Sequence, residues 1–170
     1  MTTIRRIFLG YVVIAMLLGA GVAYATRYAY TPIDYTGATW TQANGINDSG
    51  QIVGLYYDAS GDHGFLKVGT AYTSFNYPGT GAIGTFASGI NDSGQIVGYY
   101  IDGSGYQHSF LKVGNNYTRI DYPGALVTLA CGITVSGQIV GYYSDASGKT
   151  HGFIATPNNL TPIYQLLLLD

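Results

Sequence analysis

The sequence predicts an all-β protein built of repeated antiparallel strands. Three observations support this fold class: 25 of the 170 residues are glycine and 17 are tyrosine, glutamate does not occur, and one segment of the chain occurs three times. Tyrosine and β-branched residues favour strands, whereas a chain without glutamate and with few lysines is poorly suited to helices. The length allows one domain with a sizeable core.

Residues 1–25 have the pattern of a secretory signal peptide. Two arginines precede an apolar stretch over residues 7–22, and Ala-Tyr-Ala at 23–25 places small residues where a signal peptidase recognises them. An uncleaved anchor is the alternative, although about 16 apolar residues fall short of the ~20 that span a bilayer. We expect cleavage before Thr26, secretion to the exterior of a bacterial cell, no membrane association afterwards, and a single domain over 26–170.

One segment recurs with offsets of 44 and 43 residues. Gly45–Gly54, GINDSGQIVG, returns unchanged at Gly89–Gly98 and as GITVSGQIVG at Gly132–Gly141. Paired tyrosines and a His-x-Phe segment follow in each copy. A period of this length is typical of propeller blades or helical arrays, and the composition excludes the helices.

Turn residues divide each copy into four predicted strands. Asn-Asp-Ser-Gly suits a tight hairpin, because Asp and Ser favour its first positions and Gly accepts a left-handed backbone. In the second copy the chain turns again at 102–105 and at 114–116, and the last strand ends at Pro123. We therefore predict three four-stranded antiparallel meanders, or propeller-like blades, at about 38–78, 82–123 and 126–165.

The strand Ile96–Ile101 is apolar at successive positions, so both of its faces should be covered by neighbouring sheets. Its glycine, Gly98, recurs at Gly54 and Gly141 and indicates the close approach of a neighbouring sheet. Sheets stacked around an axis would meet both demands.

A surplus strand is predicted before the first complete meander. Tyr30, Thr31, Pro32, Ile33, Asp34 and Tyr35 match residues 117–122, which end the second meander. Propellers close with about four to eight blades, so three blades and a surplus strand leave open edges. Three arrangements remain open: two chains in a six-bladed ring, a compact body of three sheets, or a fibre formed by strand donation. We expect a homo-oligomer or polymer, since the four leucines at 166–169 would add an apolar patch.

The repeated segment resembles a family of bacterial extracellular proteins, the HAF-repeat proteins, named for a His-Ala-Phe signature. The likeness covers nearly all of residues 28–165. The signature histidine corresponds to His63, His108 and His151 and its phenylalanine to Phe65, Phe110 and Phe153, with glycine or serine between them. The resemblance implies a secreted, propeller-like β-repeat protein, and it supplies no catalytic residues.

Two residue sets could bind a metal. Three equivalent histidines, His63, His108 and His151, would be a zinc ligand set if they converged. A residue that builds one blade recurs in all of them, however, so we favour a bond from each histidine to a neighbouring turn. The aspartate-rich turns offer one or two carboxylates each, too few for calcium, and Thr134 and Val135 replace Asn-Asp in the third copy, so we favour a turn-forming role. We predict no metal and no cofactor.

Tyrosine supplies 17 of the aromatic residues, and aromatic faces with polar tips are suited to sugar binding. For the tyrosine pairs at 99–100 and 142–143, and for Trp40, we favour packing between sheets. Cys131, the single cysteine, occupies the position of Asn44 and Ser88 in the other copies and is expected to be a small, half-buried side chain.

The sequence contains no recognisable nucleophile and base, phosphate loop or metalloprotease motif, so we expect no enzyme activity. The net charge of −2 and the lack of a basic cluster exclude a nucleic-acid footprint. We expect a secreted structural or adhesive protein that self-assembles at the cell exterior, with residues 30–35 as the assembly strand of a filament. The alternative is a module that binds a carbohydrate or another surface ligand, with a glycan as its partner.

Overall fold

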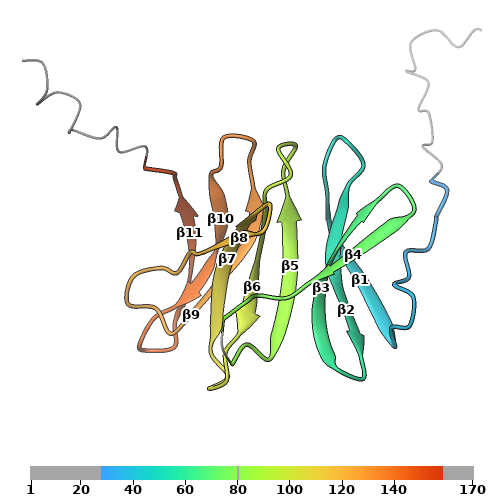
Figure 1. The fold of residues 1–170 in the computed structure, drawn as a ribbon. Helices are drawn as coiled ribbons and strands as arrows, with labels where there is room; N and C mark the ends of the chain where they lie inside the picture. The colour runs from blue at the N-terminus through green and yellow to red at the C-terminus, as the bar shows by residue number, and fades with distance from the viewer. Residues whose placement is uncertain (1–27, 80, 159–170) are drawn as a thin grey trace, which may run out of the picture. The chain divides into compact units, whose positions relative to one another are not determined.

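The computed structural model describes residues 28–79 and 81–158, and all regular structure in these residues is β-strand (Figure 1). The predicted all-β class is confirmed. The predicted signal peptide and the four C-terminal leucines lie outside the described residues. In the described part of the chain, no helix has the length and apolar character needed to cross a membrane.

Eleven strands follow one another within the described residues, and all lie in a compact unit that begins at Pro32. They are β1 (Trp40–Ile46), β2 (Ile52–Asp58), β3 (Gly61–Val68), β4 (Ala71–Phe75), β5 (Gly84–Ile90), β6 (Ile96–Ile101), β7 (Gln107–Val113), β8 (Asn116–Arg119), β9 (Val127–Ile133), β10 (Ile139–Ser144) and β11 (Thr150–Ala155). The Asn-Asp-Ser-Gly turns separate β1 from β2 and β5 from β6. As predicted, Gly50 and Gly94 have a left-handed backbone there, with φ of 72° and 74°.

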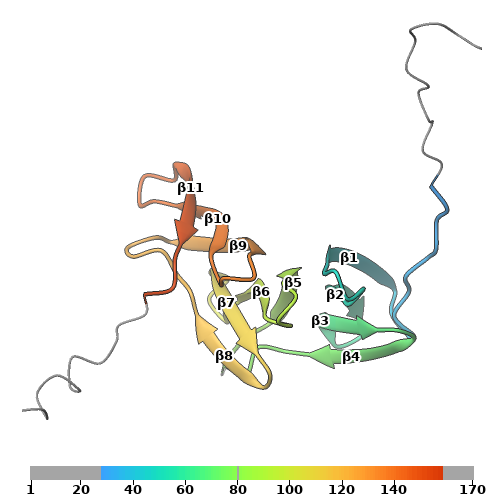
Figure 2. The same ribbon diagram turned by 90° about the horizontal axis from the view of Figure 1, so that it is seen from above.

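The strands pair mainly with their neighbours in sequence. We call β1–β4, β5–β8 and β9–β11 the first, second and third strand groups; within each group the pairing is antiparallel (Figure 2). A single parallel residue pair, Asp62 with Gly84, joins β3 to β5, so the first two groups form one mixed sheet rather than two separate ones. The fourth strand predicted for the third group falls on residues outside the described ranges. Neither sheet closes on itself in the described residues.

A recurring contact, which we call the tyrosine clamp, joins each strand group to the chain that enters it. Tyr77 leaves the first group and stacks on Tyr100 of β6 with ring centroids 3.7 Å apart, while its N–H donates to Thr85 Oγ1 of β5 at 2.9 Å. Two more clamps have the same three members: Tyr122, Tyr143 and Thr128 in the third group, and Tyr35, Tyr56 and Thr41 in the first.

Equivalent residues also form the two apolar clusters between consecutive groups. Val53 of the first group packs in one cluster with Ala87 and Ile96 of the second group. Val97 of the second group packs in the other with Ala130 and Ile139 of the third group. The strand β6 is therefore covered on both faces, as its continuous apolar sequence predicts, and burial of these side chains supplies the main driving force for joining the groups.

The mid-strand glycines are required by a neighbouring strand and not, as expected from the sequence, by a neighbouring sheet. A Cβ added to Gly98 would lie 2.0 Å from the carbonyl oxygen of Phe86, in the strand that pairs with β6. Gly54 meets the Gln42 carbonyl oxygen at 1.9 Å and Gly141 the Leu129 carbonyl oxygen at 2.0 Å in the same way. The first strand of each group is bulged beside this glycine, which brings its carbonyl group close.

Residues 30–35 do not form the predicted surplus strand. Their counterparts at 117–119 pair with β7, but within the described residues no strand lies beside 30–35 to supply hydrogen bonds. Tyr28 and Tyr30 are exposed, and only the end of the segment is held, through the clamp at Tyr35. The segment thus has the sequence of a fourth strand without a third strand to pair with.

The clamp can be tested by replacing Thr85 with valine. Thr85 is buried and its hydroxyl is the acceptor for Tyr77 N–H. Thr85→Val keeps the shape of the side chain and leaves that N–H without a partner, so we expect the free energy of unfolding to fall by about 1–3 kcal/mol. Urea denaturation measures this. Thr118→Val, at an exposed position of β8, is the control and should leave stability within about 0.5 kcal/mol of the parent; equal stabilities for the two variants would contradict the role of the clamp.

Candidate functional site

Each signature histidine bonds the turn that precedes its own strand. The Nε2-to-carboxylate distances are 3.3 Å for His63 and Asp58, 3.2 Å for His108 and Asp102, and 3.0 Å for His151 and Asp145. The histidines therefore serve three separate turns. Within residues 28–79 and 81–158, no three His, Cys, Asp or Glu side chains are grouped so that they could hold a metal ion.

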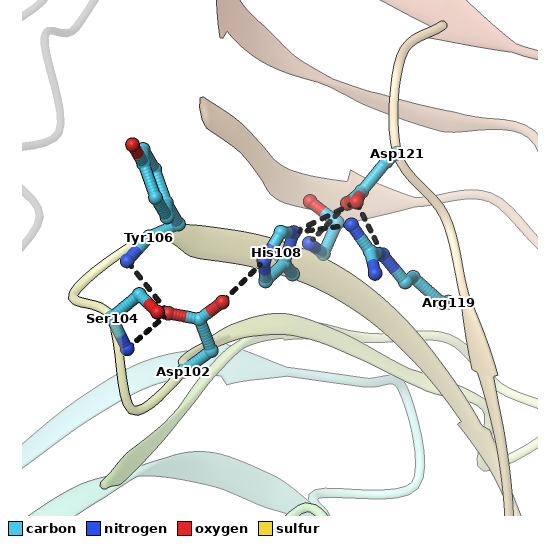
Figure 3. Close-up of polar contacts among 7 residues, drawn as sticks. Asp102, Ser104, Tyr106, His108, Arg119 and Asp121 are labelled. Atoms are coloured by element: carbon cyan, nitrogen blue, oxygen red, sulfur yellow. Dashed lines mark hydrogen bonds and ion pairs between the residues drawn. The ribbon is translucent and has the colours of Figure 1, made fainter. Parts of the chain in front are cut away.

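The aspartates of these turns accept hydrogen bonds from the turn itself, which is the turn-forming role that the sequence suggested. Asp102 Oδ1 accepts the N–H groups of Ser104 and Tyr106, both at 2.9 Å (Figure 3). The Tyr106 N–H and the bond to His108 lower the pKa of the Asp102 carboxyl group. Hydrogen bonds from the Ser60 and Ser147 hydroxyl groups are the largest cause of a lowered pKa at Asp58 and Asp145.

A second acidic group holds the other side of His108. Asp121 Oδ2 lies 2.8 Å from His108 Nδ1, and Asp121 Oδ1 accepts the Ser109 N–H at 3.0 Å (Figure 3). Arg119 forms an ion pair with the same carboxylate. Asp121 immediately precedes Tyr122, so the residue before this clamp tyrosine fixes the histidine of the strand group that the chain is leaving.

The same relation holds in the first strand group, where Asn76 precedes the clamp tyrosine. Asn76 Oδ1 lies 2.8 Å from His63 Nδ1. In the third group the described side chains provide His151 with a bond to Asp145 only. The corresponding residue before the first clamp tyrosine is Asp34, which is exposed.

A cavity of about 490 Å³ lies beside the first strands of the three groups. Trp40, Phe86 and Tyr99 supply aromatic side chains, and Phe86 stacks on Tyr99 with ring centroids 4.6 Å apart. Burial raises the pKa of the Tyr99 hydroxyl group, which stays protonated at neutral pH. The polar lining comes from Gln42, Asn44 and Ser88. The cavity thus combines aromatic faces with amide and hydroxyl groups.

Two expectations about individual residues are wrong at this cavity. Trp40 was expected to pack between sheets, but it is 43% exposed and lines the cavity. Cys131 was expected to be half-buried, but it is exposed and lines the same cavity, since it follows the strand face that turns away from the apolar clusters. Partial desolvation raises the pKa of the Cys131 thiol, which disfavours a reactive thiolate at neutral pH.

The tyrosine pairs are divided between packing and exposure. Tyr100 and Tyr143 pack in clamps, as expected, and Tyr99 lines the cavity. Tyr142, in contrast, is exposed, because the outer face of β10 has no neighbouring sheet within the described residues.

The two ends of the series of strand groups are exposed at positions that are buried inside it. Val140 of β10 is 48% exposed, whereas its equivalents Val53 and Val97 are fully buried. At the other end, Ile46 of β1 is 67% exposed, whereas its equivalent Ile90 is 8% exposed. Each end therefore presents half of an apolar cluster.

Comparison with known proteins gives no family assignment. The sequence matches no protein-family model, and it matches none of the curated proteins. The likeness to the HAF-repeat proteins therefore stays an expectation based on the repeated motif, and the function has to be inferred from the geometry.

The turn aspartates predict a dependence of stability on pH. Because their pKa values are lower in the folded chain than the ordinary value of about 3.9, they stabilise the fold above about pH 4, and this contribution is lost as the pH falls through their folded pKa values. We expect the Tm to decrease between about pH 4 and pH 2. Replacing Asp58, Asp102 and Asp145 together with asparagine, which still accepts the turn N–H groups, should flatten this decrease. Thermal denaturation at each pH measures it, and parallel profiles for the two proteins would contradict the assignment.

Proposed function

We propose that this chain is a secreted, non-enzymatic structural protein that assembles head to tail with copies of itself at the exterior of a bacterial cell. The observation that carries the proposal is the exposure, at each end, of residues whose equivalents are buried between strand groups. In this proposal the three groups are propeller-like blades of four-stranded meanders, related to the HAF-repeat proteins. A second copy continues the series where the chain stops.

The apolar residues at the two ends are complementary by position. Inside the chain, the valine of one group packs in a cluster with the isoleucine that begins the second strand of the next: Val53 with Ile96, and Val97 with Ile139. The next pair in this series is Val140 with Ile52 of a following copy. Because the donor and acceptor faces differ, the contact is heterologous, and it produces a ring if the rotation closes and a fibre if it does not.

A polar contact supports the same arrangement. Asp121 and Asn76 each bond the histidine of the preceding group. Asp34 is the equivalent residue in the N-terminal segment, and the histidine that would precede it belongs to the third group of another copy. Head-to-tail association would therefore place Asp34 of one copy beside His151 of the other, in the geometry that Figure 3 shows for Asp121 and His108.

Strand donation would occur in the same contact. In the second group, β8 pairs with β7 immediately before the chain reaches the clamp at Tyr122. The residues that precede the clamp at Tyr35, including the exposed Tyr30, would lie beside β11 of the preceding copy in the same manner. Assembly would give this segment the strand partner that the single chain does not provide among its described residues.

The contact between copies should be weaker than the contacts within the chain. Asn47 and Asn91 each donate from Nδ2 to the turn carbonyl oxygen of the next group, Asn91 O and Thr134 O, at 3.0 and 2.8 Å. Thr134 stands at the equivalent position of the third group and has no amide to donate. We therefore propose a reversible association that depends mainly on apolar burial.

The mass of the secreted protein in solution tests the proposal. We expect light scattering after size exclusion to give a mass that rises with concentration, to a defined dimer for a six-bladed ring or to a broad distribution for a fibre. Val140→Asp places a charge in the proposed contact and should shift the protein to the monomer, because burying an unpaired charge is strongly unfavourable.

Val113→Asp is the matched control. Val113 is exposed to a similar degree, 44%, but lies at the end of β7 and outside the proposed contact. This variant should assemble like the parent protein. A parent protein that stays monomeric at all concentrations, or equal effects of the two substitutions, would contradict the proposal.

A further inference from the structure

The first strand of each group has one face that is the same in all three copies. The residues Thr-x-Ala-x-Gly-Ile occur at 41–46, 85–90 and 128–133. The recurring residues have structural roles: the threonine accepts the clamp N–H, and Ala87 and Ala130 pack in the apolar clusters. The requirements of the fold therefore account for this face.

The residues between them differ in every copy. The three variable positions hold Trp40, Gly84 and Val127; Gln42, Phe86 and Leu129; and Asn44, Ser88 and Cys131. Six of these nine residues line the 490 Å³ cavity: Trp40, Gln42, Asn44, Phe86, Ser88 and Cys131. Because a residue that only builds the repeat would recur, these individual residues indicate a role that belongs to the cavity itself.

The amide groups of the cavity are held in fixed orientations. Gln42 Nε2 donates to Asn44 Oδ1 at 2.8 Å, and Asn44 Nδ2 donates to the Ala87 carbonyl oxygen at 2.8 Å. A side-chain amide has two N–H donors and an acceptor oxygen, so Gln42 Oε1 and one N–H of each amide stay available. With the Ser88 hydroxyl, they form a small set of oriented donors and acceptors next to aromatic rings.

The lining defines the chemistry of a ligand. It contains no charged side chain, so nothing in it compensates the desolvation of a charged ligand. A purely apolar ligand would leave the amide groups buried without partners, which is unfavourable. A pyranose ring has apolar C–H faces that stack on aromatic side chains and hydroxyl groups that bond amides, and the cavity has the volume of ligand sites.

We infer that this cavity is a binding site for a neutral saccharide. Trp40 and Phe86 stack on the sugar, and Gln42 and Asn44 bond its hydroxyl groups. All of these residues belong to one chain, so the site is independent of the proposed head-to-tail assembly, and either inference can fail without the other.

Trp40 is the only tryptophan in the chain, so its fluorescence reports directly on the cavity. The probes are maltotetraose, cellotetraose and chitotetraose, with sorbitol as a polyol that has hydroxyl groups but no ring. We expect a saturable change in emission with at least one of the three oligosaccharides and none with sorbitol. No saturable change with any oligosaccharide, or an equal response to sorbitol, would overturn the inference.

Variants then locate the binding. Gln42→Ala and Phe86→Ala should each weaken the affinity by about tenfold, the effect of losing one well-placed contact. Gln42 is exposed and its replacement leaves the apolar clusters intact, which keeps the test valid if Phe86→Ala fails to fold. Tyr106→Ala removes an exposed aromatic side chain outside the cavity and should bind like the parent protein. Binding that is unchanged by Gln42→Ala would overturn the inference.

Discussion

The tyrosine clamp is the contact on which the rest of the structure depends. Its stacked rings fix where the chain enters a strand group, and its N–H bond to threonine fixes the first strand of that group against the incoming segment. The clamp sits beside the apolar clusters, so the same junction that directs the chain also buries the valine and isoleucine side chains. An error at this position would affect both strand groups that meet there.

The clamp also explains why the chain has two unlike ends. It needs a residue segment from the preceding group, and Tyr35 supplies that segment to the first group although no group precedes it in the described residues. The N-terminal end is therefore prepared to receive a strand group, while Val140 at the other end presents the face that such a group would offer. Internal repetition thus becomes a specific basis for association between copies, without a new type of contact.

Much of the fold could be predicted from the sequence because repetition makes local rules visible. The period, the turns and the two-sided apolar strand at Ile96–Ile101 all correspond to observed strands. The bulge beside Gly98 and the exposure of Cys131 could not be predicted, since both depend on which backbone groups come close across strands. The cavity had a signal in the sequence: Trp40 and Gln42 alternate with residues that recur in every copy. That signal becomes meaningful only when the strand face is known.

Disulfide trapping between two variants tests the head-to-tail contact most directly. Cys131→Ser removes the native thiol from both proteins; one then carries Ile52→Cys and the other Val140→Cys. We predict that a disulfide-linked pair of chains forms on mild oxidation when the two proteins are mixed, and that neither protein forms one alone, because the proposed contact joins unlike faces. Linkage within either protein alone, or none in the mixture, would contradict the account.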